Sequence, residues 1–266
     1  MEIIFILILL VAFAAFIFGV IIEPAYILLF NRPVYVHFYP VKKTITARDE
    51  FVLRQHFVFY QKLSPKRKSY FRHRVAAFIN NYTFAGRDEL EVTREMKLKI
   101  AATAVMLTFG MRKYLPNMFS VIVLYPDIFL SKSGNYHRGE FNPMARAVVF
   151  SWKHFEEGLS YDNDNINLGL HEFAHVLHFD SHRRRKIGSS RVIFSDMLDK
   201  IWEHIQVADN RDALIQSGYL RSYAYTNQFE FIAVLLEHFF ETPQQFSQHF
   251  PVLYKYVRAM INYREG

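Results

Sequence analysis

The chain has 266 residues, 51% hydrophobic and 17% aromatic, so it can form a large packed core and is not disordered as a whole. It contains no cysteine, which excludes disulfides, thiolate metal ligands and a cysteine nucleophile. The formal charge of +7 indicates attraction to anionic surfaces, and we expect a membrane rather than a nucleic acid.

Residues Ile3 to Ile22 form an apolar run without charge or proline. Twenty such residues can cross a bilayer as a helix, so we predict a transmembrane anchor over residues 1–22. A cleaved signal peptide fits less well, because no Lys or Arg precedes the run and no small-x-small cleavage site follows it. Basic residues follow the run from Arg32 onward, which predicts a single-pass protein whose body lies in the cytoplasm.

Residues 23–50 are expected to be a juxtamembrane connector. Its apolar piece, Ala25 to Phe30, is too short to span a bilayer and fits the membrane interface. The pattern turns helical from Phe51, and no internal repeat or low-complexity segment appears. We therefore predict one further domain, residues 51–266.

Two helices have clear start signals. Ser64 and Pro65 suit the N-cap and N1 positions of a helix that runs to about Tyr82. Thr93 is expected to cap a helix that ends near Gly110. Basic side chains of the first helix are expected to form a solvated face, with anionic lipid headgroups as the alternative partner: Lys66, Arg67, Lys68, Arg72 and Arg74.

Two stretches rich in β-branched and aromatic residues predict strands, Phe119–Tyr125 and Ala145–Trp152. The segment between them, Ser131–Pro143, is expected to be a polar loop. Few strands among many helices predict an α+β fold, a mostly helical domain of the zincin type with a small sheet. We expect the second strand to hold the backbone of a peptide substrate by strand addition.

The sequence His171-Glu172-Phe173-Ala174-His175 is an H-E-x-x-H motif within an apolar run. Histidines at i and i+4 lie on one face of a helix, so both can bind one zinc ion, and the adjacent glutamate can act as a general base. The alternative is two ordinary histidines on a partly buried face. The apolar setting favours the metal site, because uncompensated polar groups there would be costly.

A catalytic zinc usually has three protein ligands. The H-E-x-x-H-x-x-G-x-x-H pattern is excluded, because His178 and Ser181 occupy its last two places. Glu230 is the favoured third ligand, with Asn227 as the N-cap of its helix and Glu237 left open as the rival. A capping-box pair of Asn227 with Glu230 is the alternative interpretation.

These motifs, together with VVFSW, FIAVLLEHFF, VIVLYPDIF and residues 84–110, resemble the Mlc titration factor A family of zinc peptidases. The resemblance covers roughly residues 63–251. It implies one zinc ion held by His171, His175 and Glu230, with Glu172 as general base and Tyr223 as oxyanion stabiliser. It also implies a gluzincin catalytic core like that of anthrax lethal factor, peptidase and chiefly aminopeptidase activity, and a transcriptional repressor of sugar uptake as partner.

The chain departs from the family pattern at His178, where the family commonly has Asp, and we expect His178 to pack or to support the ligands. The cationic run of residues 183–186 is expected to be a solvated loop, with substrate carboxylates as the alternative contact. The leading hypothesis is thus a membrane-anchored zinc metallopeptidase acting on peptides or proteins. The alternative is a membrane-tethered binding protein that sequesters a regulator, and a nucleic-acid partner is disfavoured because no such motif appears.

Overall fold

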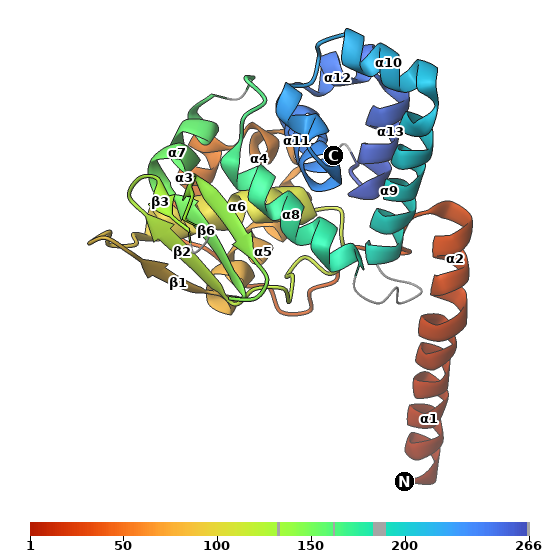
Figure 1. The fold of residues 1–266 in the computed structure, drawn as a ribbon. Coiled ribbons are helices and arrows are strands. Elements are labelled where there is room, and N and C mark those ends of the chain that lie inside the picture. The colour runs from red at the N-terminus through yellow and green to blue at the C-terminus, as the bar shows by residue number, and fades with distance from the viewer. Residues whose placement is uncertain (132–133, 162, 183–189, 265–266) are drawn as a thin grey trace.

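The apolar N-terminal run forms a helix that projects from the rest of the molecule in the computed structural model (Figure 1). The structure describes residues 1–131, 134–161, 163–182 and 190–264. The projecting helix extends over Glu2–Phe30 and comprises α1 (Glu2–Ile17), a π-helical turn (Phe18–Ile22) and α2 (Glu23–Phe30). Ala25–Phe30 thus continues the same helix and does not form a separate element.

Pro24 accounts for the π-helical turn in this helix. A proline inside a helix lacks an N–H and its ring clashes with the carbonyl four residues earlier, here that of Val20. The Glu23 N–H donates to the Phe18 carbonyl, five residues back, which widens the turn and lets the helix pass the proline. The helix is apolar and long enough to cross a membrane by length and composition.

The remaining chain is mostly helical. Its long helices α5 and α6 begin at the predicted positions, and Thr93 caps α6 through its side chain, whereas Ser64 makes no side-chain capping bond. Helix α3 begins at Ala47, four residues before the predicted start, because Thr46 and Asp49 form a capping box. The α-helices after α2 are α3 (Ala47–His56), α4 (Val58–Lys62), α5 (Pro65–Asn81), α6 (Arg94–Thr108), α7 (Trp152–Ser160), α8 (Leu168–His182), α9 (Ser190–Gln206), α10 (Ala208–Gln216), α11 (Gln228–Glu241), α12 (Pro243–His249) and α13 (Pro251–Met260).

A four-stranded sheet in the order β1-β2-β6-β5 lies beside α8 (Figure 1). Its strands are β1 (Thr83–Gly86), β2 (Val121–Tyr125), β5 (Gly139–Asn142) and β6 (Ala147–Ser151). The first three in this order are parallel, and β5 pairs antiparallel with β6. A second sheet pairs β3 (Phe129–Leu130) with β4 (Tyr136–His137). The predicted α+β fold, mostly helical with a small sheet, is confirmed.

The edge strand of the sheet differs from the prediction. Both predicted strands exist, as β2 and β6, but β6 is paired on both sides and cannot accept a further strand. The segment predicted to be a polar loop contains β5, which is the edge strand next to α8. The sequence of β5, GEFN, lacks the alternation and the β-branched residues that signal a strand. Its strand conformation depends instead on tertiary pairing with β6.

Arg74 overturns the prediction of a wholly solvated basic face on α5. Its side chain is fully buried, and its guanidinium donates to Tyr39 Oη (2.5 Å) and to the carbonyls of Thr108 (2.9 Å), Phe109 (3.1 Å) and Val36 (3.4 Å). The ring of Tyr114 lies 4.3 Å away. The carbonyl end of α6 favours a cation, so Arg74 joins α6 to the segment that follows α2.

Candidate metal centre

Helix α8 carries the two histidines of the motif on one face. The Asn167 side chain begins the helix by accepting a hydrogen bond from the Leu170 N–H at 3.0 Å, and its amide donates to the Gly158 carbonyl at 2.9 Å. One turn apart, the rings of His171 and His175 lie 4.6 Å from each other. Both side chains are largely buried, at 10% and 16% exposed, so the face they share is protected from bulk water.

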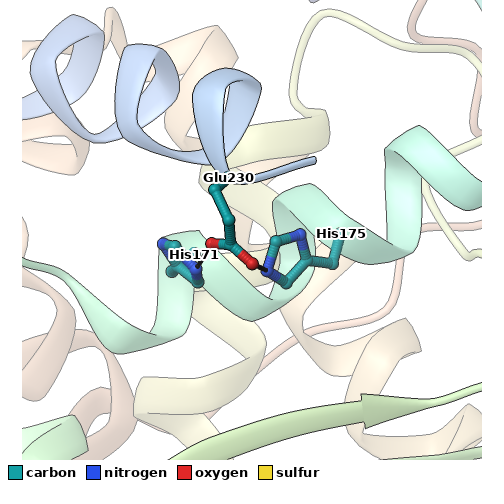
Figure 2. A group of neighbouring side chains, drawn as sticks. All are labelled: His171, His175 and Glu230. Atoms are coloured by element: carbon teal, nitrogen blue, oxygen red, sulfur yellow. Dashed lines mark ion pairs between the residues drawn. The ribbon is translucent and has the colours of Figure 1, made fainter. Parts of the chain in front are cut away.

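Glu230 approaches these histidines from α11, as Figure 2 shows. The Asn227 side chain caps α11 by accepting from the N–H groups of Phe229 and Glu230, at 2.8 and 3.0 Å. The Glu230 carboxylate, however, lies 2.8 Å from His171 Nε2 and 3.5 Å from His175 Nε2. The side chain of Glu230 is therefore directed at the histidines rather than at the cap.

The three side chains fit a metal ion. One ligand atom from each of His171, His175 and Glu230 lies within 4.8 Å of the others. Ligand bonds of 2.0–2.2 Å in tetrahedral geometry place ligand atoms about 3.4 Å apart, so only small side-chain movements would be needed. Two imidazoles and one carboxylate form a donor set that suits zinc and leaves one position open. The structure thus contains a His-His-Glu group that could hold a metal ion.

Burial and neighbouring carboxylates determine the charge of the two histidines. Burial alone would lower the pKa of His171, but its contacts with the carboxylates of Glu230 and Glu237 outweigh burial and raise the pKa to about 10. Burial lowers the pKa of His175 to about 4. The carboxylate of Glu230 therefore neutralises a charge on the histidine pair, the role that it would also have toward a metal cation.

Glu172 lies between α8 and the edge strand β5. Burial raises the pKa of its carboxyl to about 7, and it accepts a hydrogen bond from the Phe141 backbone. Gly139 allows this approach, because a Cβ atom at that position would lie 2.7 Å from Glu172 Oε1 and 2.7 Å from Leu168 Cδ1. A carboxyl with a pKa near neutrality can both accept and return a proton.

Glu237, the rival ligand, lies on the other side of His171. Its Oε1 is 3.5 Å from His171 Nδ1 and accepts from the Asn167 N–H at 3.1 Å. Its Oε2 accepts from Arg221 Nη2 at 2.6 Å, and Arg221 Nη1 donates to the Asn165 carbonyl at 2.5 Å. This carboxylate is thus placed to orient the His171 ring, as partners of metal-bound histidines do.

Sequence reasoning did not find Arg221 or Gly139. Arg221 has no motif of its own, and its only signal is its position two residues before Tyr223. Tyr223 lies in a 3₁₀ turn (Ser222–Tyr225), with its ring 6.0 Å from the His171 ring and its side chain half exposed. Burial and the neighbouring Glu230 raise the pKa of its hydroxyl to about 12, so the hydroxyl stays protonated and can donate.

His178 lies outside this group of three ligands. It is fully buried, with its ring 4.2 Å from that of Phe229 and 5.0 Å from that of His182. Burial lowers the pKa of His178 to about 3, so the ring is neutral and packs as an aromatic group. The predicted cationic loop at residues 183–186 lies outside the described residues.

A cavity of about 790 Å³ opens beside the metal site. It is lined by residues from the start of β5, from α7 and from the start of α8, and it reaches His171, Glu172 and Tyr223. Its walls combine apolar side chains such as Leu168 and Ile166 with charged ones. The cavity has the size and mixed lining of a ligand-binding cleft.

A mostly helical body with a small sheet and a His-His-Glu metal site is the architecture of a metallopeptidase domain. The chain belongs to the family of glucose-regulated metallo-peptidases M90, whose model matches residues 40–262.

Relatives of known sequence support this assignment. The uncharacterized protein slr2042 of Synechocystis sp. (strain ATCC 27184 / PCC 6803 / Kazusa) is 25% identical over 251 residues, covering 86% of this chain and 85% of the relative. Mlc titration factor A of Serratia proteamaculans (strain 568) is 27% identical over 187 residues, covering 63% and 69%. Mlc titration factor A of Yersinia pestis (strain Pestoides F) is 25% identical over 156 residues, covering 52% and 56%. The resemblance to Mlc titration factor A is therefore confirmed.

Proposed function

We propose that the chain is a membrane-anchored, zinc-dependent peptidase that hydrolyses peptide bonds with Glu172 as general base. The observation that carries this proposal is the position of a buried glutamate with a pKa near 7 between a His-His-Glu metal site and an open strand edge. A scaffold that only bound metal would have no need of such a base. The ligands are His171, His175 and Glu230.

The side chains divide the chemistry of hydrolysis. When bound, zinc supplies Lewis acidity to the carbonyl and to the attacking water. Glu172 takes a proton from the water and passes it to the leaving amine, which its pKa of about 7 allows in both directions. The Tyr223 hydroxyl donates to the oxyanion that develops at the carbonyl. Glu237 and Arg221 hold His171 in its orientation.

Strand β5 is the element that would align the substrate. The Ser151 N–H donates to the Arg138 carbonyl, so the backbone groups of Gly139 and Phe141 face away from β6, toward the open edge, where Phe141 donates to Glu172 in the free protein and a bound peptide would compete for it. An extended peptide that adds antiparallel to β5 runs from the Phe141 end to the Gly139 end. Residues after the scissile bond then enter the cavity beside Gly139, and residues before it lie along Phe141.

The helix Glu2–Phe30 is the proposed membrane anchor. None of its most apolar window is buried against the body, as a transmembrane segment requires. Positive charges follow the helix at Arg32, Lys42 and Lys43, and they favour a cytoplasmic position of the catalytic body.

Zinc content and peptide hydrolysis of the wild type and Glu172→Gln test the proposal. We expect Glu172→Gln to retain one zinc ion per chain but to lose activity by about 10² or more, as removal of a general base does. Glu203→Gln, an exposed glutamate on α9, serves as the control and should keep both. Absence of turnover by wild type on every member of a peptide library would overturn the proposal.

The aminopeptidase activity implied by the resemblance stays a prediction. Matched peptides with free and acetylated N-termini decide it, because an aminopeptidase must recognise the free amine.

A regulatory binding role is the second candidate. It is favoured by the relatives that carry the name Mlc titration factor A. Glu172→Gln would separate the two functions, since a binding role requires the surface but not the base. A partner whose regulation is abolished by Glu172→Gln would be a substrate rather than a sequestered protein.

A further inference from the structure

The anchor helix is clamped to the catalytic body where it leaves the apolar run. Glu23, the first residue of α2, is 6% exposed, and both terminal nitrogens of Arg112 donate to its carboxylate, one of them at 2.6 Å. Arg112 also donates to the Tyr35 carbonyl through Nε (3.1 Å) and Nη2 (3.0 Å), and it lies 3.9 Å from the Tyr35 ring centre. One arginine thus joins three separate segments, and we call Glu23, Tyr35 and Arg112 the anchor clamp.

Neighbouring contacts make the clamp rigid. Ile27, one turn after Glu23, is 2% exposed and belongs to the hydrophobic core. Asn31 ends α2 in the left-handed conformation, which turns the chain onto the body. Buried Arg74 then holds Val36 and Tyr39 of the same segment. The anchor is therefore fixed to the body and is not attached through a flexible linker.

The clamp also lies close to the end of the metal-binding helix. The Arg112 N–H donates to Ser190 Oγ at 3.2 Å, and Ser190 begins α9. The next residue, Arg191, pairs with Asp180 near the C-terminal end of α8 at 2.5 Å. His175 lies five residues before Asp180, about 7.5 Å along the helix axis. Figure 1 shows the C-terminal end of α8 directed toward the start of α9.

Length places the clamp at the edge of a bilayer. The twenty apolar residues before Glu23 span about 30 Å as a helix, the thickness of the hydrocarbon core. Glu23 therefore stands at the boundary of the apolar layer, and the body begins there without a spacer. The metal site would be held at a fixed, short distance from the membrane surface.

The direction of β5 determines which end of a bound peptide lies nearer the anchor clamp. Gly139 lies against Leu168 and Glu172 in the first half of α8, whereas the Phe141 ring lies 5.6 Å from that of Phe179, near the end of α8. A substrate antiparallel to β5 has the residues before its scissile bond on the Phe141 side. These residues point toward the clamp, and hence toward the membrane.

We infer that the anchor clamp and the direction of β5 select a substrate class: polypeptides that leave the same bilayer through a membrane segment N-terminal to the cleavage site. Such a substrate reaches the site with its chain already in the direction proposed for antiparallel addition to β5. Because its N-terminal side remains in the membrane, it is cut internally, which makes this inference an alternative to the aminopeptidase prediction. This inference rests on the proposed peptidase function.

The test uses full-length protein reconstituted with reporters in lipid vesicles. One reporter places a transmembrane helix before the cleavage sequence, a second places the same helix after it, and a third is the free peptide. Both tethered reporters have the same concentration in the membrane, so their ratio isolates direction. We expect the first reporter to be cleaved at least fivefold faster than the second. The rate should be highest when fewer than about ten residues separate the transmembrane helix from the cleavage sequence, because an extended chain spans about 3.3 Å per residue and the site is held close to the membrane.

Variants show whether the clamp causes this preference. Arg112→Ala should lose the spacer optimum and reduce the ratio to below twofold, while hydrolysis of the free peptide stays unchanged. Arg32→Ala is the matched control and should behave as wild type, since among the described residues Arg32 bonds to Tyr26 and lies against the rings of Tyr26 and Phe30, all within the anchor. Equal rates for both tethered reporters, or a preference that survives Arg112→Ala, would overturn the inference. Failure of wild type to cleave the free peptide would instead overturn the peptidase function.

A spectroscopic measurement tests the clamp without catalysis. The chain has no cysteine, so the replacements Leu10→Cys and Gln216→Cys introduce two spin labels, one on the anchor and one on the exposed end of α10. With Arg112 in place, we expect a single narrow distribution of distances between the two spin labels. With Arg112→Ala, the distribution should be at least twice as broad. A broad distribution before Arg112 is changed would refute a rigid anchor.

Discussion

Glu237→Gln is the substitution that most directly tests how His171 is held. Glu237 is 1% exposed, and its carboxylate contacts Arg221, the Asn167 N–H and His171 Nδ1. Glutamine has nearly the same shape, but it lacks the negative charge, and its NH₂ group cannot accept from Arg221 or Asn167. The change therefore removes charge and hydrogen bonding while leaving the volume of the side chain in place.

Two separate losses follow from these contacts. Hydrogen bonds to a charged group contribute about 1.5–3 kcal/mol each, so loss of the Arg221 bond should lower the free energy of unfolding by about 2–3 kcal/mol. Loss of a group that orients a metal-binding histidine typically weakens metal affinity 10–100-fold, or about 1.4–2.8 kcal/mol. We expect zinc to remain bound, with an affinity reduced within this range.

Competition with a chelator measures the zinc affinity, and urea unfolding of the metal-free protein measures stability. Glu230→Gln gives the reference for loss of a ligand, and Glu203→Gln, at the exposed glutamate on α9, gives the control. Zinc binding by Glu237→Gln as weak as that by Glu230→Gln would show that Glu237 is itself a ligand. An unchanged zinc affinity would refute the orienting role.

Three further substitutions test other parts of the structure. Gly139→Ala should reduce kcat at least tenfold with zinc retained, because the added Cβ meets Glu172 Oε1 at 2.7 Å; assays of turnover and metal content check this. Arg74→Met should lower the free energy of unfolding by about 3 kcal/mol in urea titrations, because it leaves buried carbonyls without a donor. Burial raises the pKa of Glu241 to about 8, so its folded form keeps a proton that the unfolded chain loses above about pH 4.5. Between pH 4.5 and 8, the free energy of unfolding of wild type should therefore fall relative to that of Glu241→Gln by up to about 1.4 kcal/mol per pH unit. Urea unfolding across this pH range measures the difference, and parallel curves of unfolding free energy against pH would contradict it.

Features set by local chemistry could be predicted from the sequence. The starts of α6 and α11 follow from Thr93 and Asn227, because an N-cap bonds to backbone groups only two or three residues away. The pairing of His171 with His175 likewise needs only one turn of helix. In each of these cases the sequence spacing fixes the distance between the interacting groups.

Features set by contacts between distant segments could not be predicted in the same way. Strand β5 exists because β6 pairs with it, and its own residues carry no strand signal. The position of Glu237 depends on Arg221 and Asn167, which are 16 and 70 residues away. On α11 alone, Glu230 and Glu237 point in similar directions, so periodicity could favour one ligand but could not assign the orienting contact to the other.

Charged residues show why composition alone does not reveal how the connector is joined to the body. A boundary at residue 50 follows the change in composition, but it cuts through α3. Arg74 and Arg112 look like surface residues in the sequence, since arginine is rarely fully buried. Each instead lies where carbonyls or a carboxylate from another segment can satisfy it, and together they bind residues 23–39 to the body. Because the buried Arg74 and the partly buried Arg112 each need such partners, these two arginines make the position of the anchor a property of the folded body.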